Sequence, residues 1–167
     1  MTLYDDLHRE HRARIVRLCR VLLADPDEAA DAAQDVFTKL HQALEHETRP
    51  MEWPAWLTRV AVNACRDRQR SGWWRWWRVR GVELDHAGLR SAIRTPEDEL
   101  IGRETQHRVW AAIRALPVRQ REVFALRQLD GLSTEEVAGT LAISTGSVKQ
   151  HLFRAVHALR RAMGDDT

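Results

Sequence analysis

Apolar residues recur at intervals of three and four along most of this chain, which is the repeat of an amphipathic α-helix. No stretch shows the alternation of apolar and polar residues that a half-buried β-strand needs. At 167 residues, 44% of them hydrophobic, the chain can build one ordinary domain or two very small ones. The sequence therefore predicts an all-α fold.

The first half of the chain predicts three helices. Asp25 can cap a helix N-terminus, and Pro26 suits the first position of that helix. A polar loop that contains Pro50 precedes the third helix, and Ser71 with Gly72 ends it. The expected helices span about 3–23, 26–45 and 53–70.

The third expected helix has two chemically different sides. Trp53 and Trp56 belong to an apolar side, and aromatic residues at helical spacing usually pack inward. The other side lies in a strongly basic stretch, 49–80, which an acidic stretch, 83–104, follows. Because the net charge of the whole chain is only +2, this separation indicates two surfaces with different partners. The outward donors are Arg59, Asn63, Arg66 and Arg70.

Regular periodicity is lost from Gly72 to about Thr95, so this stretch is expected to link two helical domains. A cluster of four tryptophans opens it. Three roles stay open for the cluster: packing on the first domain, contact with DNA or an inhibitory partner, and a place at a membrane surface. The tryptophans are Trp73, Trp74, Trp76 and Trp77.

Two short helices joined by a tight turn are predicted near the C-terminus. Ser133 and Glu136 form a capping box that opens the first, and Ser144 can cap the second. This is the helix-turn-helix arrangement, whose second helix enters the major groove of DNA. The pattern alone also allows a helical hairpin with a solvated basic face. The outward residues of the second helix are Lys149, Gln150, Phe153 and Arg154.

These outward side chains suit recognition of a base sequence. Lys149 and Arg154 can donate to guanine or to phosphate, and Gln150 can pair with adenine. Phe153 can contact a thymine methyl group. The second helix is therefore the first candidate for a DNA-binding site.

The chain resembles bacterial RNA polymerase sigma factors at both ends. Their region 4, which binds the promoter −35 element, resembles LPVRQREVF at 116–124, GLSTEEVA at 131–138 and SVK at 147–149. Residues 31–37, DAAQDVF, resemble the region 2 helix that docks on the polymerase clamp. Residues 56–67 resemble the region 2 helix that engages the −10 element. The short linker points to the extracytoplasmic-function class. The resemblance implies region 2 at 1–71, a linker at 72–96 and region 4 at 97–167.

The resemblance also implies an alternative sigma factor that binds core RNA polymerase, directs it to promoter DNA and is controlled by an anti-sigma factor. It implies no cofactor and no metal. It assigns core polymerase binding to Asp31, Gln34, Asp35 and Phe37, −10 binding to Arg59, Asn63, Arg66 and Arg70, and −35 binding to Ser147, Lys149, Gln150, Phe153 and Arg154.

Some positions depart from the family pattern. Ala30 stands where the docking helix often carries an acidic residue, so a clamp contact is expected to be weaker or shifted. Gln150 stands where the recognition helix often carries Ser, which leaves the preferred −35 sequence open. Asp67 is expected to lie buried among arginines and to orient one of them.

Other classes of protein are disfavoured. Cys19 and Cys65 lie inside expected helices, which favours free thiols in a reducing cytoplasm over disulfides. His8 and His11 are expected to be solvated, and no cysteine or histidine shows metal-ligand spacing. No phosphate-binding glycine loop or nucleophile motif suggests an enzyme. No apolar run is long enough to cross a bilayer, so no stable membrane insertion is expected.

The alternative function is a helix-turn-helix transcription regulator with an N-terminal sensing or dimerisation domain. Such a regulator would share the C-terminal motif. It would not need the docking pattern at 34–37 or the basic, aromatic helix at 53–70. The first half of the chain therefore discriminates between the two functions.

Overall fold

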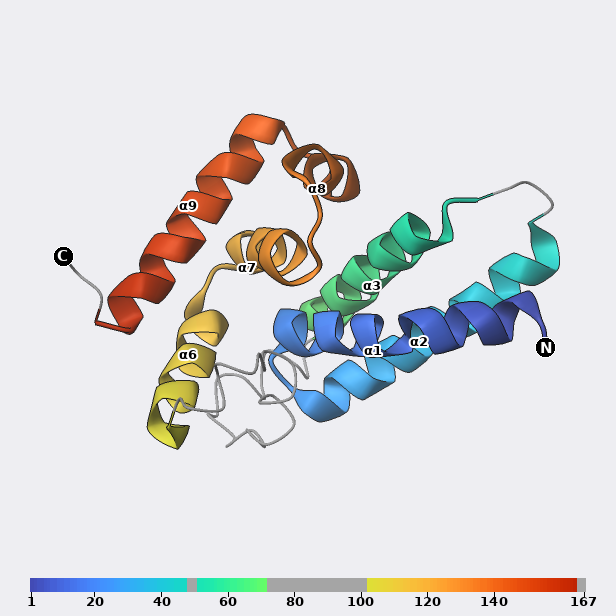
Figure 1. Ribbon diagram of the computed structural model, residues 1–167, viewed down its shortest axis with the longest axis horizontal. Helices are drawn as coiled ribbons and strands as arrows, with labels where there is room; N and C mark the ends of the chain where they lie inside the picture. Colours follow the sequence, from blue (N-terminus) through green and yellow to red (C-terminus); the bar gives the residue numbers. More distant parts are fainter. Residues whose placement is uncertain (48–50, 72–101, 165–167) are drawn as a thin grey trace. The chain divides into compact units, whose positions relative to one another are not determined.

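The computed structural model describes residues 1–47, 51–71 and 102–164 (Figure 1). Within these ranges it contains helices and no β-strand, which confirms the predicted all-α fold. The chain divides into two compact units, Met1–Leu84 and Asp85–Thr167, and each has its own core. The tryptophan cluster and the limits predicted for the linker lie outside the described residues.

In its described residues, 1–47 and 51–71, the first unit contains three helices: α1 (Leu3–Leu23), α2 (Pro26–His46) and α3 (Trp53–Arg70). Each packs against the other two. Their bounds agree with those expected from the sequence, because caps and proline positions are local signals. The core side chains of this unit include Ile15, Leu18, Leu22, Val36, Leu40, Leu57 and Ala61.

Asp25 caps α2 as predicted. Its carboxylate accepts hydrogen bonds from the backbone N–H groups of Asp27 at 2.9 Å and Glu28 at 3.2 Å. Asp25 is buried, and burial raises the pKa of its carboxyl group more than these hydrogen bonds lower it. The cap is therefore formed by a carboxylate that is costly to charge.

The expectation that both N-terminal histidines are solvated is wrong. His11 is buried because it lies on the same stripe of α1 as Leu7 and Ile15, at spacing four, and that stripe faces the core. His8 is half-buried, with its ring centroid 4.6 Å from that of Phe37. Elsewhere in this unit both cysteines are buried thiols that form no disulfide, as expected.

The second unit contains α6 (Arg103–Ala115), α7 (Val118–Phe124), a π-helical segment η2 (Ala125–Leu129), α8 (Thr134–Leu141) and α9 (Thr145–Ala162). α9 packs against α6, α7 and α8. The π-helical continuation of α7 was not predicted from the sequence. The core side chains here include Trp110, Ile113, Leu116, Val123, Leu126, Val137, Leu141 and Val148.

α8 and α9 form the predicted helix-turn-helix. The Ser133 hydroxyl accepts from the N–H of Glu136, and the Glu136 carboxylate accepts from the N–H of Ser133, each at 3.1 Å. Ala142 takes a left-handed conformation, φ 56°, that ends α8 and turns the chain. Ser144 then caps α9, as expected.

Candidate nucleic-acid interface

The start of α9 is fixed by two serines. The hydroxyl of Ser144 accepts from the N–H of Ser147 at 3.0 Å and donates to the Ser147 hydroxyl at 3.0 Å. Ser147 is half-buried, and its backbone N–H and its hydroxyl both bond to Ser144 within the turn. This arrangement fixes the end of the helix that would enter a major groove.

The structure brings the other four predicted −35 residues together on one exposed face of α9. Val148 and Ala155 are buried in the second unit, and they determine which side of α9 faces away from the core. A helix repeats every 3.6 residues, so the four predicted residues share a face. The exposed side chains are Lys149, Gln150, Phe153 and Arg154.

Phe153 is unusual because its side chain is large, apolar and 70% exposed. Its ring stacks on that of His157, with centroids 5.7 Å apart and planes 12° apart. His157 was not among the predicted site residues, although its position one turn after Phe153 is a usable signal. The pair widens the flat surface that α9 can offer to a base or a sugar.

The inner flank of α9 faces charged residues of α7. Glu122 is buried and accepts from Arg119 at 3.3 Å, and Arg121 is buried and donates to the carbonyl of Leu116 at 3.3 Å. The pKa of His151 is lowered by burial and by the nearby Arg119 and Arg154. His151 is therefore neutral near pH 7, and the positive charge of α9 stays on its outward residues.

The loop before α8 is held by η2. Arg127 donates to the carbonyl of Leu132 at 3.3 Å, and the Leu132 N–H donates to the carbonyl of Leu126 at 3.0 Å. Gly131 has φ 72°, a left-handed conformation that glycine adopts without strain. The sequence analysis missed Arg127, since its role depends on the π-helical turn.

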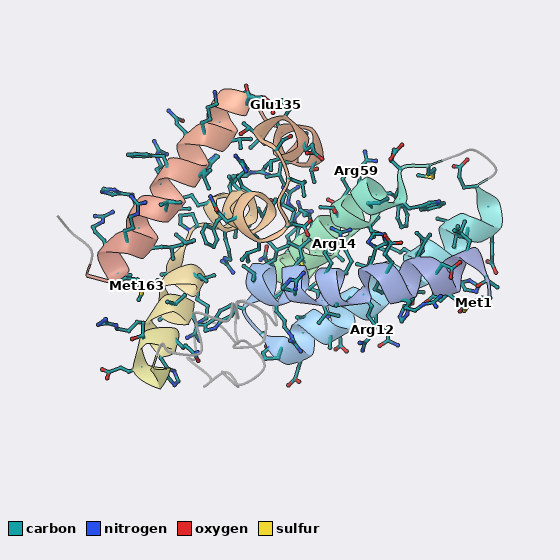
Figure 2. The ribbon with its side chains drawn as sticks, in the orientation of Figure 1. Met1, Arg12, Arg14, Arg59, Glu135 and Met163 are labelled. Atoms are coloured by element: carbon teal, nitrogen blue, oxygen red, sulfur yellow. The ribbon has the colours of Figure 1, made fainter. Side chains whose placement is uncertain are left out.

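α3 carries the predicted −10 residues along one stripe. Arg59, Asn63 and Arg70 are exposed, and Arg66 is half-buried. Figure 2 shows Arg59 extending from α3 away from α1 and α2. The structure therefore places these four donors on the side of α3 opposite its buried side chains, which include Leu57, Thr58, Ala61 and Cys65.

The N-terminal end of α3 is anchored from α1. Arg14 donates to the hydroxyl of Thr58 at 2.9 Å and to the carbonyl of Pro54 at 3.2 Å. Trp53 and Trp56 are half-buried and pack edge to face, with centroids 5.5 Å apart. Inward packing of these tryptophans is thus only partial. The polar loop that contains Pro50 includes residues 48–50, which lie outside the described residues.

The expectation that Asp67 lies buried is wrong. Its side chain is 68% exposed, and its closest ion-pair distance is 3.9 Å, to Arg70 on the same helix. The neighbouring Arg68 points toward α2 instead, because it lies on the opposite flank of α3. The arginine next to Asp67 is therefore Arg70, at the exposed surface of α3.

α2 presents three of the four predicted docking residues. Asp31, Gln34 and Asp35 are exposed, whereas Phe37 is only 5% exposed. Phe37 and Gln34 instead line an open cavity of about 530 Å³ between α1 and α2, with Tyr4, His8, Arg12, Val16, Arg20, Ala30, Ala33 and Thr38. Phe37 is therefore a packing residue at the edge of the predicted docking face, and Ala30 lines the same cavity.

The described ranges, 1–47, 51–71 and 102–164, contain no candidate metal site and no candidate membrane span. No group of three or more His, Cys, Asp or Glu side chains there could hold a metal ion. No helix in those residues is both long and apolar enough to cross a membrane.

The exposed basic helix of a helix-turn-helix in one unit, and a stripe of donors on α3 in the other, are features of a DNA-binding transcription factor. Sigma-70 region 2 matches residues 7–75, and Sigma-70 region 4 matches residues 106–159. The ECF RNA polymerase sigma factor SigM of Mycobacterium tuberculosis is 30% identical over 161 residues, 96% of this chain and 77% of SigM. SigW of Bacillus subtilis, also an ECF sigma factor, is 28% identical over 167 residues, 97% of this chain and 89% of SigW.

A solved structure has a similar fold. The sigma factor RpoE of Bartonella quintana, in complex with the anti-sigma factor NepR, has a TM-score of 0.70 and 21% identity. The match covers 97% of this chain and 99% of RpoE. This chain belongs to the ECF family of RNA polymerase sigma factors. A ligand-sensing regulator is set aside, because its first half would not match sigma region 2.

Proposed function

We propose that region 4, residues 97–167, places α9 in the major groove of the −35 element. Lys149 and Arg154 would contact guanine or phosphate, Gln150 would read adenine, and Phe153 would lie against a thymine methyl group. The observation that carries this proposal is the exposure of these four side chains on a helix that Val148 anchors in the core. Ser147 would add a contact at the helix start.

We propose further that region 2, residues 1–71, captures the melted −10 strand on α3, ahead of a linker at 72–96. A single strand needs cationic donors for its phosphates and polar or aromatic groups for its bases. The stripe of donors on α3 supplies both phosphate and base partners. Its members are Arg59, Asn63, Arg66 and Arg70.

Docking on core polymerase is assigned to the exposed face of α2. Asp31, Gln34 and Asp35 would pair with polymerase donors. Phe37 would support this face from the adjoining cavity. Sigma factors are initiation factors and the polymerase makes the bonds, so we infer no catalysis by this chain and a cytoplasmic site of action.

Photocross-linking tests the placement of the two DNA-binding sites. A photoreactive residue at Gln150 or at Asn63 is introduced into the full chain, and holoenzyme is assembled on promoter DNA. The Gln150 variant should cross-link near −35 and the Asn63 variant near −10. A variant at Glu104, which is exposed on α6, is the control. Cross-links from both positions to one duplex site would contradict the proposal.

Control by an anti-sigma factor is also proposed, supported by the complex of the related RpoE with NepR. A protein that copurifies with the chain from its native cells can be added to transcription reconstituted with core polymerase. We expect initiation to stop and to return when excess chain is added. A copurifying protein that leaves initiation unchanged is not the regulator proposed here.

A further inference from the structure

One arginine joins α3 to α2 through two carboxylates. The Arg68 guanidinium places Nη1 2.7 Å from Oε2 of Glu28 and Nη2 3.0 Å from Oδ2 of Asp35. Glu28 and Asp35 are about two turns apart on the same face of α2. The two Nη atoms of one planar guanidinium therefore hold Glu28, Asp35 and the turns of α2 between them against α3.

One end of this bridge is more buried than an ordinary surface ion pair, and the other end is as exposed as one. The side chains of Arg68 and Glu28 are 25% and 16% exposed, whereas that of Asp35 is 56% exposed. Burial alone would lower the pKa of Arg68, but hydrogen bonds to Glu28 and Asp35 outweigh it and raise the pKa. Arg68 is therefore always charged, and its bond to Asp35 is the one that a partner can reach.

Both helices in this bridge belong to proposed binding sites. Asp35 is one of the carboxylates assigned to polymerase docking, and Arg68 lies between Arg66 and Arg70 in the sequence of the −10 helix. A polymerase cation that approaches Asp35 must share its carboxylate with Arg68. Any loss of the bridge also frees α3 to shift against α2.

We propose that Arg68 is a positioning residue that limits docking strength at Asp35 and fixes the −10 helix against the docking helix. This inference rests on the proposed function. It predicts opposite effects of one substitution: removal of the guanidinium strengthens core binding and weakens promoter opening.

The test is Arg68→Met in the full chain, which keeps most of the stem and removes the charge. Titration of core polymerase gives the binding constant, and permanganate reactivity of −10 thymines at saturating core gives promoter opening. We expect core binding to tighten about three-fold, the scale of one partly exposed ion pair, and opening to fall several-fold. Arg9→Met is the matched control, because it removes an exposed 2.6 Å ion pair with Asp6 in the same unit.

A double-substitution cycle separates positioning from loss of structure. In an Asp35→Asn background, Arg68→Met should no longer tighten core binding, because the competition for that carboxylate is gone. Arg68→Lys, which keeps the charge without the planar guanidinium, serves if the Met variant does not fold. Promoter opening should fall less in Arg68→Lys than in Arg68→Met.

Two results would overturn the inference. One is weaker core binding and weaker opening in proportion to the loss of folded chain, which is what a purely structural role produces. The other is unchanged core binding by a folded Arg68→Met chain. Failure of the wild-type chain to bind core polymerase in the same titration would instead contradict the proposed function.

Discussion

At the scale of single residues, burial decides which charged groups act inside the fold and which face a partner. His151, on the inner side of α9, faces Glu122 of α7, while Lys149 and Arg154 remain outside. The sequence could place the outer pair from helical spacing. It could not place the inner pair, because their burial depends on how α7 packs against α9.

Substitution of Asp25 tests whether ionisation of its buried carboxyl group lowers the free energy of unfolding. Because burial raises its folded-state pKa above 3.8, the folded chain holds this proton longer than the unfolded chain does. The wild-type chain should therefore lose stability, relative to Asp25→Asn, as pH rises from 3.8 through the folded pKa. Asn is an equally good cap, whereas Asp25→Ala should cost about 1 kcal/mol. Urea unfolding across this pH range checks both, and a pH-independent difference between wild type and Asp25→Asn would contradict the account.

Substitution of Gln150 tests base recognition. Gln150→Ala should relax selection at one −35 base pair by about 1–3 kcal/mol and leave the other positions as they were. Sequencing of transcripts from a randomised −35 library measures this directly. Glu104→Gln should leave the selected sequence unchanged. A uniform loss at every position would show that Gln150 does not read a base.

At the scale of helices, local sequence signals predicted where the helices begin and end. Tertiary packing decided the π-helical turn and which side chains reach across to a neighbouring helix. The caps at Asp25, Ser133 and Ser144 were readable because a short polar side chain meets the helix N–H groups within three residues. The π-helical turn η2 has no such local signal. The error at Asp67 has the same origin, since the pattern could not show that Arg68 reaches across to α2.

Both α1 and α8 begin with a capping box, Thr2 with Asp5 and Ser133 with Glu136, which allows a matched comparison of the units. Ser133→Ala should destabilise α8 by about 1 kcal/mol, because the N–H of Glu136 loses its partner. Thr2→Ala removes the equivalent cap of α1. Hydrogen exchange should then speed up in α8 for the first variant and at the start of α1 for the second. Faster exchange in α8 of the Thr2→Ala variant would contradict the expectation that each cap affects only the stability of its own unit.

At the scale of the whole molecule, the charge distribution favours DNA binding by the chain together with core polymerase over DNA binding by the free chain. The net charge is only +2, although both proposed DNA-binding helices carry basic stripes. The free chain should therefore bind duplex promoter DNA weakly and with marked salt dependence, and tight binding should need core polymerase. Fluorescence anisotropy at several salt concentrations measures both states. Nanomolar affinity of the free chain at physiological salt would be inconsistent with this view.

The central claim is that this chain directs core polymerase to promoters through two separate DNA elements. In vitro transcription with purified core polymerase, with and without the chain, on a sequenced library of promoter fragments tests it most directly. The account predicts chain-dependent initiation from fragments that share two spaced elements, one near −10 and one near −35. Absence of initiation, with the chain binding duplex DNA as a dimer, would contradict it.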